Sequence, residues 1–123
     1  MVSYLFNKDL GLLEAKFEAD VVVSEVADYI ISTKENKTYP RDLKIITDAT
    51  SANFKFSPSD LNILIEENYK SIEKYDFITD AIILENPKNT ALSMLFGELV
   101  KTNKYRFNVF STRDAALNWL KTF

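Results

Sequence analysis

The sequence contains neither cysteine nor histidine, and only two of its 123 residues are glycine. Without these residues the chain has no disulfide, no thiol nucleophile, no Ser-His-Asp triad and none of the usual ligands of structural zinc or haem. Gly11 and Gly97 are too few and too far apart to build a phosphate-binding or dinucleotide-binding loop. We therefore expect neither a metal ion nor a cofactor.

Charge and hydropathy exclude two further classes of protein. Fifteen basic and 18 acidic residues give a formal charge of −3, whereas a general nucleic-acid binder needs a basic face. No apolar run approaches the ~18 residues of a membrane span. The first residues also lack the basic and apolar regions of a signal peptide. We expect a cytoplasmic protein that binds no nucleic acid and has no integral membrane segment.

Two hydrophobic periods alternate along the chain. Residues 2–6 and 13–19 alternate with a period of two, and the turn between them ends at Gly11, which predicts a β-hairpin. Asp20 is placed to cap a helix that begins at Val21. Further strands are predicted at 43–48, 81–84 and 105–110, with 49–56 as a connection, and further helices after Ser57, Asn86 and Ser111.

The element order is therefore ββαβαβαβα. Strands separated by helices become parallel neighbours joined by right-handed crossovers, and the first strand pairs antiparallel at an edge. Residues 1–123 are thus expected to form a single α/β domain with one five-stranded mixed sheet and four helices.

This layout resembles the STAS domain, and more closely the SpoIIAA-like group of small bacterial proteins. The resemblance covers nearly the whole chain and rests on residues 10–17, the helix after Asp20, the strand 44–48, the helix after Ser57 and the closing segment 109–120. It implies a non-enzymatic regulatory module that binds a protein partner. In that family a serine at the start of the second helix is phosphorylated, and Ser57 or Ser59 occupies this place. The family's glycine is missing here, and Pro58 and Asp60 depart from its pattern, so we do not expect the family's phosphoswitch.

Two groups of polar and aromatic residues are candidate binding sites. The candidates for protein interaction or phosphorylation flank the second helix: Phe54, Lys55, Ser57, Ser59 and Asp60. The candidates for a ligand site lie where strands are predicted to end: Asp48, Thr50, Ser51 and Asn86. Each has a structural alternative. Ser57, Asn86 and Ser111 suit helix caps, Asp48 suits an Asx-turn, and Phe54 and Phe56 could pack beneath their own loop.

Three hypotheses for function follow, from different classes. The first is the non-enzymatic protein-interaction module, which is compatible with a homodimer that covers an edge strand. The second is a domain that binds a small apolar molecule or lipid between the sheet and its helices, suggested by the aromatic content of 13%. The third is a hydrolase or transferase that uses Asp48 together with Ser59.

Overall fold

The computed structural model describes all residues from 1 to 123. Its elements follow one another as β1 Val2–Asn7, β2 Leu12–Val21, α1 Val23–Glu35, β3 Asp42–Phe54, the 3₁₀ turn η1 Pro58–Asp60, α2 Leu61–Ile72, β4 Phe77–Ile83, α3 Pro87–Leu99, β5 Tyr105–Phe110 and α4 Arg113–Leu120. The predicted order of strands and helices is confirmed.

The five strands form one mixed sheet in the order β1-β2-β3-β4-β5. β1 is antiparallel to β2, and every other neighbouring pair is parallel. Each parallel pair is joined through one helix, which is the connection that a parallel sheet requires. The sheet topology therefore agrees with the sequence prediction.

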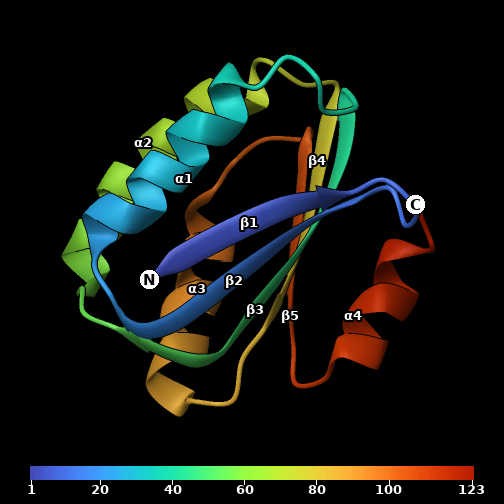
Figure 1. Cartoon of the computed structure of the whole chain (residues 1–123). Helices are drawn as coiled ribbons and strands as arrows, with labels where there is room; N and C mark the ends of the chain where they lie inside the picture. Colours follow the sequence, from blue (N-terminus) through green and yellow to red (C-terminus); the bar gives the residue numbers. More distant parts are fainter.

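Helices cover both faces of the sheet. Figure 1 shows α1, α2 and α3 on one side and α4 on the other. The larger hydrophobic core lies on the α1–α3 side, and a smaller one lies beneath α4. β4 contributes to both cores by alternation, since Ile78 and Ile82 belong to the larger one while Ala81 and Ile83 belong to the smaller.

The β1–β2 hairpin turns at the predicted glycine. Gly11 has φ +66°, a conformation that glycine adopts without steric cost. The side chain of Asn7 supports the turn by accepting a hydrogen bond from the amide of Leu10 at 3.1 Å. The prediction for this segment is confirmed.

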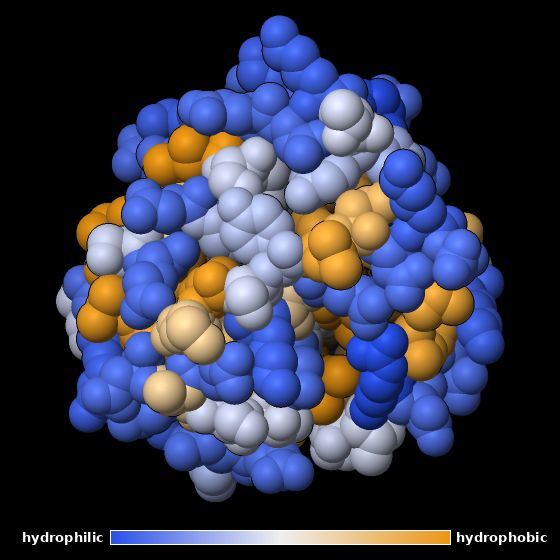
Figure 2. Space-filling model, in the orientation of Figure 1, coloured by the Kyte–Doolittle hydropathy of each residue, from blue (hydrophilic) through white to orange (hydrophobic).

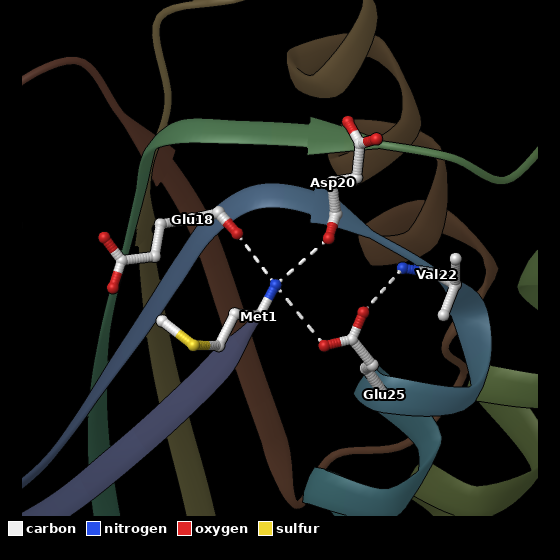
Figure 3. Close-up of polar contacts among 5 residues, drawn as sticks. All are labelled: Met1, Glu18, Asp20, Val22 and Glu25. Atoms are coloured by element: carbon white, nitrogen blue, oxygen red, sulfur yellow. Dashed lines mark hydrogen bonds and ion pairs between the residues drawn. The ribbon is translucent and has the colours of Figure 1, made fainter.

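The start of α1 differs from the prediction. Val21, expected to open the helix, is the last residue of β2, where it pairs with Phe54 of β3 and has no exposed surface. Asp20 is consequently not the cap. The Glu25 carboxylate accepts from the amide of Val22 at 3.2 Å instead, and it lies 3.3 Å from the ammonium group of Met1 (Figure 3).

β3 is longer than predicted, because residues 49–54 continue the strand instead of leaving the sheet. After a bulge in β3 between Asp48 and Ser51, residues 51–54 pair with the end of β2, and the buried Ala52 and Phe54 alternate with exposed neighbours. Asn89 of α3, which has no exposed surface, holds this extension. Its Nδ2 donates to the Ala52 carbonyl at 2.9 Å, and its Oδ1 accepts from the Phe54 amide at 3.3 Å.

Of the three caps predicted at Ser57, Asn86 and Ser111, only Asn86 accepts backbone hydrogen bonds with its side chain. Asn86 accepts hydrogen bonds from the amides at the start of α3, including that of Lys88 at 2.8 Å. Ser57 occupies the predicted N-cap position of η1, but its side chain accepts no cap hydrogen bond, and the Asp60 carboxylate instead accepts from the Ser57 amide at 2.9 Å. Ser111 is not a cap, because α4 begins one residue later and Thr112 accepts from the amide at its N-terminus.

The outer surface carries no single large apolar area in the view of Figure 2, where hydrophobic residues form separate small patches among hydrophilic ones. Leu5 of the edge strand β1 is 75% exposed and is the most exposed of the large hydrophobic residues. None of the helices combines the length and the apolar character needed to cross a lipid bilayer.

Candidate functional site

A cavity of about 90 Å³ lies between the sheet and helices α1, α2 and α3. Thirteen of its 17 lining residues are hydrophobic, and the other four are Thr47, Asn68, Asp80 and Ser93. Aromatic rings form much of the apolar wall, with Phe54 and Phe56 stacked at 5.0 Å between ring centroids and Phe17 packed edge-on against Phe54. A small apolar group would therefore be well surrounded here.

The polar side of the cavity is built around the carboxyl group of Asp80. Tyr105 of β5 donates its hydroxyl to Asp80 Oδ2 at 3.0 Å. Tyr29 of α1, Thr47 of β3 and Asn68 of α2 line the same cavity, so that three strands and two helices each contribute one residue. We call these five residues, Tyr29, Thr47, Asn68, Asp80 and Tyr105, the polar cluster.

Three atoms of the polar cluster have no hydrogen-bond partner within the protein, although each has almost no exposed surface. They are the hydroxyl of Tyr29, Nδ2 of Asn68 and Oδ1 of Asp80. These are the only such side-chain atoms in the whole structure, and all three residues line the cavity. Buried polar atoms are nearly always paired, so their concentration at one cavity points to a binding partner.

Burial raises the pKa of Asp80 from its ordinary value of 3.8 to about 7, although the hydrogen bond from Tyr105 and the nearby hydroxyl of Thr47 act in the opposite direction. Burial, followed by the nearby Asp80 carboxylate, also raises the pKa of both Tyr29 and Tyr105 well above the usual 10. No lysine or arginine lines the cavity to offset the carboxylate. Asp80 is therefore largely neutral below pH 7.

The placement of Asp80 follows from strand alternation. Ile78, Asp80 and Ile82 point to the same face of β4, and the two isoleucines lie in the larger core. An aspartate at a core position of a strand covered on both faces is costly unless it has a function or a partner. The signal is present in the sequence, but Asp80 is not among the predicted site residues.

None of the four residues predicted to form a ligand site lines the cavity. Asp48 and Thr50 lie within β3, because that strand continues beyond the predicted end. Asp48 Oδ1 accepts from the amide of Thr50 at 3.0 Å and from its hydroxyl at 2.7 Å, which confirms the structural alternative of an Asx-turn. Ser51 is exposed in the same strand, and Asn86 serves as the cap of α3.

The predicted interaction residues divide between core and surface. Phe54 is only 4% exposed and lines the cavity, so it is not accessible as an interaction residue and agrees with the alternative that it is packed inside. Lys55, Ser57 and Ser59 are exposed, and the hydroxyls of the two serines lie 2.8 Å apart. Asp60 is partly exposed and is engaged with the amide of Ser57. No hydrogen bond joins Asp48 to Ser59, so the structure does not bring together the two residues that the third hypothesis requires.

A second depression, of about 660 Å³, lies between α3 and β5. It is wider than the cavity, and none of its lining residues carries a buried polar atom without a partner. No three acidic side chains in the structure converge on a point that could hold a metal ion. The cavity with its polar cluster is therefore the stronger candidate for a binding site.

The fold has a counterpart among solved structures. An uncharacterized protein of the DUF3478 family with a SpoIIAA-like fold, from Shewanella loihica PV-4, superposes with a TM-score of 0.62. The two sequences are 15% identical, and the match covers 98% of this chain and 92% of the other. No protein-family model and no curated protein matches the sequence. This chain accordingly has a SpoIIAA-like fold, as the resemblance in sequence layout implied.

Proposed function

We propose that this domain binds a small amphipathic molecule in the cavity between the sheet and helices α1–α3, without catalysing a reaction on it. The observation that carries the proposal is the position of the three unpartnered polar atoms. They gather at a cavity whose remaining wall is largely apolar. A ligand with one polar end would pair those atoms and place its apolar part against the aromatic rings.

The volume limits the size of this ligand. An apolar cavity of about 150 Å³ accommodates benzene, so a cavity of about 90 Å³ suits a molecule of roughly four or five non-hydrogen atoms. A complete acyl chain would fit only if the helices moved outward. Tiny ligands gain at most about 1.5 kcal/mol per atom, which sets the best dissociation constant in the micromolar range.

The chemistry of the cavity supports binding over catalysis. Its lining offers one carboxyl group, the hydroxyls of tyrosine, serine and threonine, and no basic side chain. Neither serine nor threonine in the lining is hydrogen-bonded to a base that could activate its hydroxyl as a nucleophile, and the hydrogen bond that Asp80 accepts comes from the phenol of Tyr105. The proposal therefore treats Asp80 as a recognition group.

Equilibrium dialysis tests the proposal. Wild-type protein is dialysed against the low-mass extract of its host cells, and retained compounds are measured by mass spectrometry. Ser93 lines the cavity, is 6% exposed and makes no side-chain hydrogen bond, so the Ser93→Leu variant fills the cavity directly. The exposed Ser24→Leu on α1 is the matched control.

The expected result is at least one compound that wild type and S24L retain and that S93L loses. Circular dichroism and the thermal midpoint establish that S93L is folded. Equal retention by wild type and S93L, or retention of nothing by wild type, would contradict ligand binding in this cavity.

A regulatory role through protein binding is the second candidate, favoured by the exposed segment before α2. Lys55, Ser57 and Ser59 present a positive charge and two hydroxyls there, while the neighbouring Phe54 and Phe56 line the cavity. Ligand and partner would thus contact one continuous segment. Affinity capture from host cells with wild type and with a Lys55→Ala/Ser59→Ala variant tests this role. A partner retained equally by both proteins would count against it.

A further inference from the structure

The three unpartnered atoms of the polar cluster differ in what they require from a ligand. Asp80 Oδ1, when ionised, only accepts a hydrogen bond, and Asn68 Nδ2 only donates one. The Tyr29 hydroxyl can do either. Asn68 and Tyr29 are 7% and 8% exposed, so solvent at the surface does not reach them freely.

Only some polar groups of a ligand can meet the hydrogen-bonding requirements of these three atoms. An ammonium group supplies donors alone, so it would pair with Asp80 and leave Asn68 Nδ2 without an acceptor. A carboxylate supplies acceptors alone, and its charge would face the carboxyl group of Asp80 with no lysine or arginine in the lining. A hydroxyl or a primary amide both donates and accepts, and therefore meets both requirements at once.

We infer that the ligand of this cavity is a neutral molecule whose polar end is a hydroxyl or a primary amide, held between Asp80 and Asn68, with its apolar part against the phenylalanines. This inference rests on the proposed function and names the class of its ligand. Asn68 and Asp80 are then the residues that determine specificity. Tyr105 is a positioning residue, because its hydroxyl holds the other oxygen of Asp80 at 3.0 Å.

The protonation of Asp80 agrees with a neutral partner. Its pKa of about 7 means that the carboxyl group is often protonated at neutral pH, and Oδ1 can then donate as well. A hydroxyl group pairs with either form, because it can reverse the direction of its hydrogen bond. The titratable groups that face Asp80 are Tyr29 and Tyr105, both of which stay neutral in this range because their pKa values are raised.

Two isomers provide the sharpest test. 1-Butanol and diethyl ether have the same atoms and nearly the same size, but only butanol can donate a hydrogen bond. Butylammonium and butyrate extend the series with a donor alone and an acceptor alone. Binding is measured by titrating each compound into ¹⁵N-labelled protein at pH 8, where Asp80 is largely ionised and only accepts, and following the amides of residues that line the cavity, such as Leu64 and Ser93.

Butanol should bind wild type at least tenfold more tightly than ether, since ether leaves a buried group unpaired. In the double variant Asn68→Leu/Asp80→Leu, which preserves side-chain size, butanol and ether should bind with about equal affinity. The S93L variant should bind neither isomer.

Three outcomes would overturn the inference. Equal binding of butanol and ether to wild type would show that affinity for the cavity does not depend on the polar group of the ligand. Tighter binding of butylammonium than of butanol would show that a charge pair with Asp80 dominates. The absence of specific binding in the cavity, seen either as no binding of any probe or as binding that persists in S93L and therefore occurs elsewhere, would contradict the proposed function as well.

Discussion

Replacing Asp80 with asparagine should change how the stability of this protein depends on pH. Between pH 3.8 and 7 the folded chain keeps a proton on Asp80 that the unfolded chain has released. The unfolding free energy therefore falls as pH rises through this range. Asparagine is neutral at every pH and its amide oxygen can still accept from Tyr105, so the Asp80→Asn variant should lack this fall.

The size of the effect follows from the two pKa values. Each pKa unit corresponds to about 1.36 kcal/mol, so the rise from 3.8 to about 7 amounts to about 4 kcal/mol in total. About 3 kcal/mol of this should be lost by wild type between pH 5 and pH 9. The stabilising contribution is complete only below pH 3.8, where both folded and unfolded chains are protonated.

Urea denaturation of wild type and D80N at pH 5, 7 and 9 measures the difference directly. The chain has no histidine or cysteine, so no side chain with an ordinary pKa between 5 and 8 obscures the result. D80N should gain about 3 kcal/mol relative to wild type from pH 5 to pH 9. The matched control is the exposed Asp28→Asn on α1, for which the difference should stay constant. A constant difference for D80N as well would refute the reasoning that burial keeps this carboxyl group protonated.

Two further predictions concern the helix that closes the cavity. Asn89→Ala should destabilise the protein by about 2–4 kcal/mol, because a buried carbonyl and a buried amide of β3 lose their partner. Hydrogen exchange of the Phe54 amide should accelerate, and an unchanged exchange rate would contradict this prediction. Gly97→Ala should cost about 1 kcal/mol despite better helix propensity, since the new Cβ would lie 2.8 Å from Phe107 Cδ2. Combining it with Phe107→Leu should remove most of that cost in urea denaturation, and strictly additive effects would argue against the clash.

Elements defined by local patterns were predicted well from the sequence. The hairpin turn at Gly11 and the cap at Asn86 depend on residues within a few positions of each other, and both are present. The errors occurred where tertiary contacts extended a strand. Val21 and Phe54 pair in the sheet, which lengthens β2 past the predicted helix start and β3 past its predicted end.

The candidate site was the harder part. Four candidates lay at predicted strand ends and five beside the second helix, and of these nine only Phe54 lines the cavity. Asp80 carried a usable signal, because an aspartate between two core isoleucines breaks the apolar face of a covered strand. Asn68 and Tyr29 carried none, since a polar residue on an amphipathic helix face is compatible with many positions.

The alternation of hydrophobic periods was sufficient to determine the number, order and type of the elements, because each period reflects the geometry of a single strand or helix. The tertiary structure alone decided that Tyr29, Thr47, Asn68, Asp80 and Tyr105 meet at one cavity. These residues come from five different elements, and their approach depends on how the strands are paired in register and how three helices pack on one face. Packing of that kind produces no periodic pattern in the sequence, which is why the polar cluster can be identified only in the folded protein.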